Sequence, residues 1–173
     1  PLLKVKEKLI KWLSGFVFIH ARCLVFSSEW RKRMIVDAYN IPLGKTRLIK
    51  NAFVFTGSPA NKQMGNVILW AGRVLYLKNL RRLIKAFASI KVSSYALHLV
   101  GDGPEKEKLE DTIKEYGAED RIKFFPSMSH QELMAKLASA TAVVLPSISD
   151  VGPNIVAEAI ATFVPVIMTK ESG

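Results

Sequence analysis

Two carboxylates eight positions apart, Asp150 and Glu158, flank a turn in the C-terminal part of the chain. A short apolar run, 142–145, precedes the turn, and apolar residues at helical spacing follow it. The segment therefore predicts a strand, a turn with exposed backbone N–H groups and a helix N-terminus, which together form an anion site. Because a carboxylate accepts hydrogen bonds through both oxygens, two acids beside a phosphate suit the hydroxyls of a sugar and a ribose.

Two cations, Arg73 and Lys78, stand five positions apart just ahead of a predicted helix. Arginine offers a planar fork to a phosphate, and lysine offers a compact point charge. Held at a diphosphate, both would stabilise the charge that develops when a sugar–phosphate bond breaks. The alternative is that they are surface cations like Arg81 and Arg82, and only the acids further along the chain favour phosphate binding.

The elements expected from residue 67 onward bring these side chains to one edge of a sheet. Apolar strands alternate with helices, which predicts an α/β fold with a doubly wound parallel sheet. Ligands bind at the carboxyl ends of the strands in such sheets, and each cluster of unusual residues follows a strand. The expected strands are 67–71, 96–100, 122–125, 142–145 and 165–168, and the expected helices are 79–91, 105–116, 130–139 and one with Pro153 in its first turn.

The N-terminal third predicts a separate piece of structure. We expect helices over 2–19 and 29–39, the second with Ser28 as its N-cap, a strand at 23–26 and an extended segment at 47–55. Residues 57–66 are polar, rich in turn residues and without periodicity, so we expect a linker there. The chain begins without Met and stops shortly after an apolar run, and we interpret it as a fragment.

The charge is concentrated in the same N-terminal third. Residues 1–54 hold eleven Lys and Arg against three Asp and Glu, so they carry eight of the ten net positive charges. A basic block of this kind fits an anionic membrane, a nucleic acid or simply a solvated helix face. Aromatic residues are not interleaved with the charges, so nucleic acid is the weaker option. The first helix, with Trp12 and Phe16, could lie on a membrane surface or pack against another part of the protein.

Several classes of site have no support in the sequence. A single cysteine, Cys23, argues against a disulfide scaffold and fits a reducing compartment such as the cytoplasm. No cluster has metal-ligand spacing, and the glycine fingerprint of nicotinamide enzymes is missing. The histidines have structural interpretations: His98 alternates within a strand, and His20 and His130 have no partner at useful spacing. No apolar run is long enough to span a membrane.

Three segments resemble one known family. Residues 143–173 are similar to the acid-x7-acid signature of retaining GT-B glycosyltransferases of family 4, glycosyltransferase group 1. Residues 68–87 resemble its GR…K segment, and Gly101 to Pro104 resembles its GxGP turn. Residues 23–53 resemble, less specifically, the last strand–helix–strand of its N-terminal acceptor domain. The chain departs from the pattern at three positions: Asp150 stands for the usual Glu, and Asn79 and Phe163 stand for Gly, the last expected to change helix packing only.

The resemblance implies a domain organisation. It makes residues 1–56 the C-terminal part of the N-terminal acceptor domain and 57–66 a linker. It makes 67–173 a Rossmann-like nucleotide-sugar-binding domain, incomplete at its C-terminus.

The resemblance also implies an activity and assigns residues to it. A hexose would pass from a UDP- or GDP-hexose to a glycan or lipid-linked acceptor with retention, without a metal or other cofactor. Arg73 and Lys78 would hold the diphosphate, Glu158 the ribose, and Asp150 the donor sugar. The family motifs map as substrate-binding onto Gly72, Arg73, Lys78, Gly103, Pro126, Asp150, Gly152, Pro153, Asn154, Ile155 and Glu158.

Two points stay open at this stage. Because Asp150 replaces the usual Glu, the alternative is a non-catalytic nucleotide-sugar-binding or assembly subunit on the same fold, since a fold does not determine a function. A polysaccharide-biosynthesis enzyme in the cytoplasm is the leading expectation, and peripheral contact at the inner face of the membrane through the basic segment stays open beside it.

Overall fold

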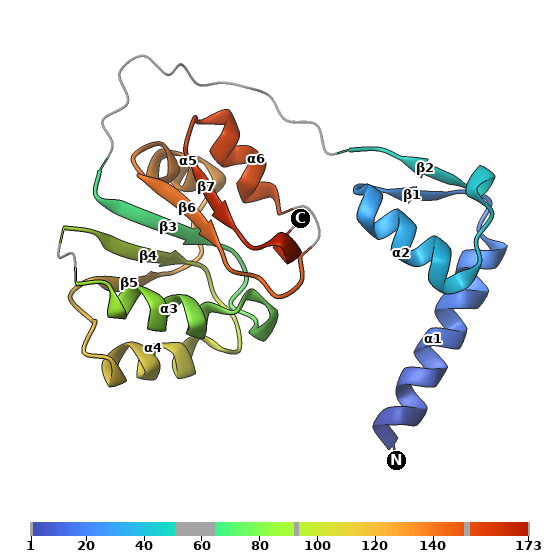
Figure 1. The fold of residues 1–173 in the computed structure, drawn as a ribbon, viewed down its shortest axis with the longest axis horizontal. Coiled ribbons are helices and arrows are strands. Elements are labelled where there is room, and N and C mark those ends of the chain that lie inside the picture. The colour runs from blue at the N-terminus through green and yellow to red at the C-terminus, as the bar shows by residue number, and fades with distance from the viewer. Residues whose placement is uncertain (1, 51–64, 92–93, 151–152, 173) are drawn as a thin grey trace. The chain divides into compact units, whose positions relative to one another are not determined.

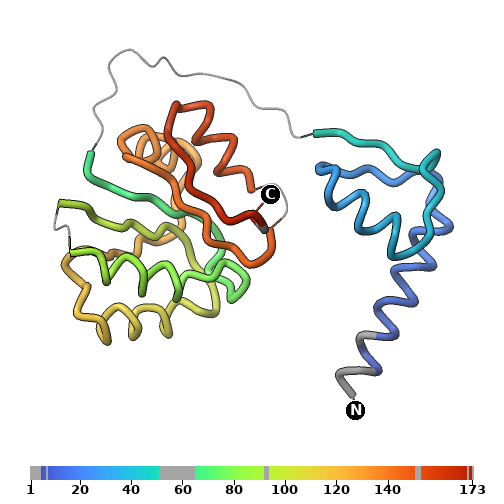
Figure 2. Tube along the Cα trace, viewed as in Figure 1, coloured from blue at the N-terminus to red at the C-terminus, as the bar shows by residue number. Residues whose placement is uncertain are grey.

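The computed structural model describes residues 2–50, 65–91, 94–150 and 153–172. The chain divides into two compact units, Pro1–Ala52 and Phe53–Gly173, which are described separately. Figure 2 follows the chain from blue at the N-terminus to red at the C-terminus. Most of the predicted linker, 57–66, lies outside the described residues, so the domain boundaries proposed from the sequence stay predictions.

The first unit consists of two helices and a pair of parallel strands. Its elements are α1 (Leu2–His20), β1 (Leu24–Phe26), α2 (Glu29–Tyr39), the 3₁₀ turn η1 (Leu43–Lys45) and β2 (Thr46–Leu48). The predicted N-cap of α2 is confirmed, because the Ser28 side chain accepts a hydrogen bond from the backbone N–H of Arg31. The helix α1 packs on α2 where the buried Gly15 meets the ring of Tyr39.

The second unit contains a five-stranded sheet in the order β5-β4-β3-β6-β7, with every neighbouring pair parallel. Helices α3 and α4 contact each other, as do α5 and α6, and Figure 1 shows the two pairs on opposite faces of the sheet. The predicted doubly wound parallel α/β fold is therefore confirmed. The strands are β3 (Val67–Ala71), β4 (Ala96–Val100), β5 (Ile122–Phe125), β6 (Ala142–Leu145) and β7 (Val166–Met168). The helices are α3 (Leu80–Ser89), α4 (Lys106–Glu115), α5 (His130–Ala138) and α6 (Asn154–Ala161), with the 3₁₀ turns η2 (Tyr76–Lys78) and η3 (Lys170–Ser172).

The core of this unit explains why its strands are continuous apolar runs. A parallel sheet is covered by helices on both faces, so both sets of side chains along a strand are buried. Leu69 and Trp70 of β3 point to opposite faces, and both are fully buried, as are Leu97 and Leu99 of β4. Ile84 of α3 and Leu137 of α5 complete the layers from the two sides. Among the described residues, no helix combines the length and the apolar character that crossing a bilayer requires.

The structure changes the interpretation of Phe163. The backbone N–H of Phe163 donates to the carbonyl of Ile160 at 3.0 Å, and that of Val164 donates to the carbonyl of Ala159 at 2.8 Å. These two bonds form a Schellman motif at the end of α6, in which the residue after the C-cap takes the left-handed conformation and is usually glycine. Phe163 has φ +56° and an exposed ring. The replacement of glycine therefore places a side chain in a strained backbone conformation, beyond the change in helix packing expected from the sequence.

Replacing Phe163 by Gly should stabilise the chain relative to Phe163→Ala. Both variants remove the ring, so their difference isolates the backbone. The left-handed conformation costs about 1–2 kcal/mol in a residue with a Cβ, and glycine loses about 0.5–1 kcal/mol more through conformational entropy. Urea unfolding followed by circular dichroism should show Phe163→Gly more stable by roughly 0.5–1 kcal/mol. Equal stability of the two variants would contradict the strain.

Candidate functional site

The loops that follow β3, β4, β5 and β6 leave the same edge of the sheet, because all these strands are parallel. From β3 the chain moves through α3 to β4 and then to β5, and it then returns to the other side of β3 to form β6. The strand order therefore reverses between β3 and β6. Ligands of open α/β sheets bind in the crevice at such a switch point. The predicted cations follow β3 and the predicted acids follow β6, so they belong to the two strands that flank it.

The second cation, Lys78, and the first acid, Asp150, are in direct contact. The Nζ of Lys78, in η2, forms an ion pair and hydrogen bond with the Oδ2 of Asp150, in the loop after β6. The side chains are 19% and 13% exposed, so water screens the pair only in part. The buried hydroxyl of Ser147 donates to the same carboxylate oxygen at 3.3 Å. Two residues singled out from distant parts of the sequence are thus brought together.

Two further bonds fasten η2 to the loop after β6. The backbone N–H of Ile148 donates to the carbonyl of Leu77 at 2.8 Å. The side-chain amide of Asn79 donates to the carbonyl of Pro146 at 3.1 Å. Asn79 also has φ +56°, a conformation that glycine and asparagine adopt more readily than other residues. Asn79 therefore replaces the usual glycine without loss of the turn, and it adds a bond across the switch point.

The glycines after β4 allow two loops to approach closely. A Cβ on Gly101 would lie 1.9 Å from the carbonyl oxygen of Gly72, and one on Gly103 would lie 2.3 Å from that of Val74. The backbone N–H of Val74 donates to the carbonyl of Asp102 at 2.9 Å. The G-x-G spacing thus has a packing reason, since any side chain would push the loops apart. A contact between Gly103 and a nucleotide stays a prediction.

Asp102 ties the loop after β4 to the loop after β5. Its Oδ2 accepts a hydrogen bond from the backbone N–H of Ser127 at 3.1 Å, next to the exposed Pro126. Its Oδ1 accepts one from Lys106 at 2.8 Å. The bond from Lys106, followed by that from Ser127, lowers the pKa of Asp102 below its ordinary value. Sequence analysis gave Asp102 no role, because a side chain that supports a neighbouring loop leaves no periodic signal.

Gly72 and Arg73 directly follow Ala71, the last residue of β3, and both are exposed. Within the part of the chain that the structure describes, no hydrogen bond or ion pair engages its guanidinium. An unengaged guanidinium keeps its five N–H donors for a ligand. The structure thus places Arg73 in the loop after β3, at the predicted edge.

Glu158 has a partner that the sequence analysis missed. The Nε2 of His130, the first residue of α5, lies 3.2 Å from the Oε1 of Glu158 on α6. The search for partners at useful spacing did not reveal this contact, although the predicted helix does begin at His130. The two residues are 28 positions apart and become neighbours only because α5 and α6 pack on the same face of the sheet. Because the two residues are on different helices, the spacing of residues within one helix does not predict their contact.

The start of α6 supplies the remaining predicted residues. Pro153 is the N-cap of α6, one position before the helix begins, whereas the sequence predicted it inside the first turn. Asn154 begins the helix and has an exposed side chain. The side chain of Ile155 is 6% exposed and belongs to the core, so only its backbone can face a ligand. Gly152 lies outside the described residues. Within those residues, no group of three His, Cys, Asp or Glu side chains could hold a metal ion.

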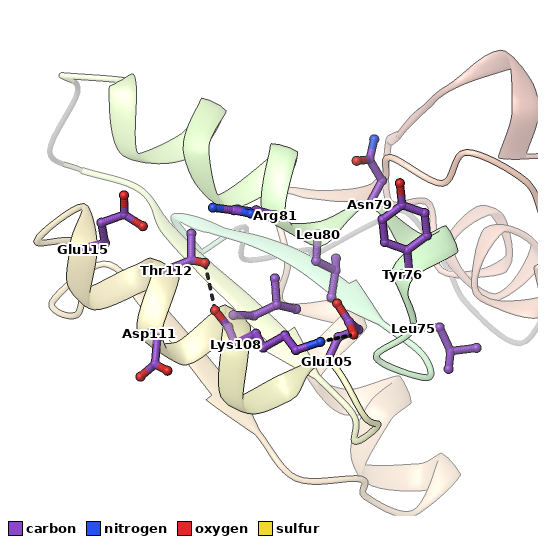
Figure 3. A pocket seen from close by; sticks show the side chains of 11 residues that line it. Leu75, Tyr76, Asn79, Leu80, Arg81, Glu105, Lys108, Asp111, Thr112 and Glu115 are labelled. Atoms are coloured by element: carbon purple, nitrogen blue, oxygen red, sulfur yellow. Dashed lines mark hydrogen bonds and ion pairs between the residues drawn. The ribbon is translucent and has the colours of Figure 1, made fainter.

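A separate cavity of about 410 Å³ opens between α3 and α4 (Figure 3). None of the residues predicted to bind the substrate lines it. Its lining carries charges of both signs: Lys108 pairs with Glu105 at 3.1 Å, and Arg81, Asp111 and Glu115 also line it. A mixed rim gives no net field that would attract a diphosphate. This cavity is therefore distinct from the site at the switch point.

Comparison with known proteins shows the family of the chain. The sequence profile described as "Glycosyl transferases group 1" matches residues 55–173, which is more than half of the chain. An uncharacterized glycosyltransferase of Methanocaldococcus jannaschii is 30% identical over 175 residues, covering 91% of this chain and 45% of that protein. The amylovoran biosynthesis glycosyltransferase AmsD of Erwinia amylovora is 39% identical over 61 residues, covering 35% of this chain and 17% of that protein.

A solved structure shows the same fold. The crystal structure of Anabaena HepE in complex with UDP and glucose aligns with a TM-score of 0.79 at 21% identity. The alignment covers 94% of this chain and 48% of HepE, so the chain spans about half the length of such proteins. At this identity the likeness supports the Rossmann-like half of a GT-B fold and no more.

The Lys78–Asp150 pair should show coupling in a double-mutant cycle. Each single change, Lys78→Ala or Asp150→Ala, leaves a partly buried charge without its partner, whereas the double variant leaves neither. The free energies of unfolding should therefore be non-additive by roughly 1–2 kcal/mol in urea titrations. The cycle Arg82→Ala with Glu107→Ala, two exposed residues on different helices, is the control and should be additive. Additive losses at positions 78 and 150 would contradict the pairing.

Proposed function

The chain belongs to the glycosyl transferases group 1 family, and from this premise we propose that it carries the nucleotide-sugar-binding domain of a retaining GT-B enzyme of family 4. The enzyme transfers a hexose from a UDP- or GDP-hexose to a glycan or lipid-linked acceptor. The observation that carries the proposal is the contact between Lys78 and Asp150 across the switch point, since it joins the predicted phosphate and sugar ligands at one place.

The diphosphate is held by the two cations after β3. Arg73 is exposed and can present its planar fork to two phosphate oxygens. An ammonium has three N–H donors, and Asp150 takes one of those of Lys78, so the pair fixes the position of Nζ while leaving donors for a phosphate. Negative charge accumulates on the diphosphate as the glycosidic bond breaks. Two fixed cations stabilise that charge, which is why the proposal includes no metal.

The sugar and ribose are held by the acids and by the start of α6. Asp150 accepts hydrogen bonds from hydroxyls of the donor sugar, and the backbone N–H groups at the N-terminus of α6 donate hydrogen bonds to it. Glu158 accepts hydrogen bonds from the ribose hydroxyls. Attack by an acceptor hydroxyl on the face that the diphosphate leaves is the route to retention that the resemblance to the family implies. HepE, with bound UDP and glucose on the same fold, supports the ligand class.

A non-catalytic nucleotide-sugar-binding or assembly subunit is the second candidate. Asp150 is one methylene shorter than the usual Glu and is engaged by Lys78 and Ser147, which favours a structural use of this acid. Both candidates bind a nucleotide sugar, and only the first turns it over. Hydrolysis of the donor or transfer of the sugar by the protein separates them.

Peripheral membrane contact is proposed for α1. The helix exposes basic side chains, Lys6, Lys8 and Lys11, and it meets the rest of its unit through the buried Gly15. Phe18 packs its ring against Tyr39, but the other described large apolar side chains of α1 are about half exposed or more: Val5, Leu9, Ile10, Trp12, Leu13, Phe16, Val17 and Ile19. An apolar arc flanked by lysines suits an anionic lipid surface. The proposed location is the cytoplasm at the inner face of a membrane, where a lipid-linked acceptor or a growing polysaccharide would be met.

Isothermal titration with UDP, GDP and ADP should identify a nucleotide that binds the full chain. Arg73→Ala and Glu158→Ala should each weaken its binding by about 1.5–3 kcal/mol, because each removes a hydrogen bond to or from a charged group. Arg82→Ala and Glu107→Ala, which change exposed residues of the same types away from the site, are the matched controls. Binding of no nucleotide, or equal effects of the site and control variants, would refute the proposed site.

Co-sedimentation with vesicles should test the membrane contact. Vesicles containing phosphatidylserine should bind the chain, and pure phosphatidylcholine should bind it less, because the basic side chains are attracted to anionic lipid. Binding should fall at high salt and in the variant Trp12→Ala with Phe16→Ala. Trp30→Ala, which removes an exposed indole from α2, is the control. Absence of the protein from the pellet of anionic vesicles would contradict the proposed membrane contact of α1.

A further inference from the structure

The contact between His130 and Glu158 joins the loop after β5 to the helix after β6. His130 opens α5, and its backbone is fixed by a capping box: the Ser129 side chain accepts from the N–H of Glu132, whose carboxylate accepts from the N–H of Ser129 at 2.8 Å. The N-terminus of α5 follows the carboxyl end of β5, so His130 lies at the edge of the sheet where the loops after the other strands also begin. The ring is 71% exposed and its Nε2 reaches Glu158.

Glu158 depends on this single side-chain partner. Its side chain is only 18% exposed, and in the part of the chain that the structure describes, no other side chain or backbone group is bonded to its carboxylate. An ionised carboxylate can only accept, so the Nε2 of His130 carries the proton and donates. The bond occupies one acceptor position at Oε1 and restricts rotation about the last torsions of the glutamate.

We propose that His130 is a positioning residue of the nucleotide site, which orients the Glu158 carboxylate to receive the two hydroxyls of a ribose. The inference rests on the proposed function and adds a residue to it. A ribose diol needs two acceptor positions in a fixed orientation, and a carboxylate has about four. His130 uses one of them and holds the others in place before the nucleotide arrives. Ordering the acceptor in advance lowers the cost of binding.

A purely structural role would leave a different signature. An ion pair or hydrogen bond with a partner as exposed as His130 contributes little to folding. Its loss should therefore leave the unfolding transition nearly unchanged, while a positioning role should appear in nucleotide affinity. It should also disappear when the ribose hydroxyls or the Glu158 carboxylate are removed, because His130 acts only through them.

The experiment is a titration of the full chain with whichever of UDP, GDP or ADP binds it and with the 2′,3′-dideoxy form of the same nucleotide. His130→Ala should weaken binding of the ribonucleotide about three- to tenfold, the range expected for loss of one hydrogen bond. His130→Gln, which restores an N–H donor, should recover part of that loss. Neither variant should change affinity for the dideoxy nucleotide. Gln131→Ala, the exposed neighbour on α5, is the matched control and should bind as the parent does.

The double variant sharpens the result. In a Glu158→Ala background, His130→Ala should cause no further loss, since coupled residues are non-additive. Weakening by Glu158→Ala with no effect of His130→Ala would overturn the inference and leave the proposed function standing. Equal weakening for both nucleotides would overturn it in favour of a general structural role. No effect of Glu158→Ala would overturn the proposed function, and the inference with it.

Discussion

The pairing of β3 with β6 is the constraint on which the site depends. These two strands lie side by side although two strands and three helices separate them along the chain. Their parallel direction sends both following loops to the same edge, so a cation after one meets an acid after the other. The Lys78–Asp150 pair, the Ile148–Leu77 bond and the Asn79–Pro146 bond all span this junction. The chemistry at the edge is therefore a consequence of strand order, and a sheet with another order would scatter the same residues.

The neighbouring loops are held by backbone contacts that tolerate few substitutions. Gly101 and Gly103 let the loop after β4 lie against the loop after β3, and Asp102 between them reaches on to Ser127 in the loop after β5. Three loops are thus linked in sequence, from the switch point to the far side of the sheet. Because each link uses a backbone group, the edge has a defined shape before any ligand contacts it.

The sequence predicted the fold from features that repeat and missed features that occur once. Alternating apolar runs and helical periods located every strand and helix of the second unit to within a few residues, since burial on both faces of a sheet leaves a periodic trace. The cations and acids were found because their spacing matches a signature. His130 was missed because its partner is on another helix, and the strain at Phe163 was missed because a left-handed φ is set by the end of α6 rather than by the residue itself. Asn79 shows the favourable case, in which the side chain suits the backbone that the turn requires.

The two acids of the signature have different partners: a lysine and a hydroxyl contact Asp150, and an imidazole contacts Glu158. Asp150 lies in the loop after β6 at a partly buried junction, where the charge of Lys78 and the buried hydroxyl of Ser147 help to offset the loss of water around its carboxylate. Glu158 lies on α6 and is buried to a similar degree, 18% exposed against 13% for Asp150, and its partner is the exposed imidazole of His130. A ligand that approaches Asp150 must share it with Lys78, whereas one that approaches Glu158 finds most of its lone pairs available. In the proposed site, the first acid therefore contacts the lysine assigned to the phosphate, and the second keeps acceptor positions for the ligand. The shorter Asp at the first position is consistent with this division, because its carboxylate stays close to the backbone and within reach of η2.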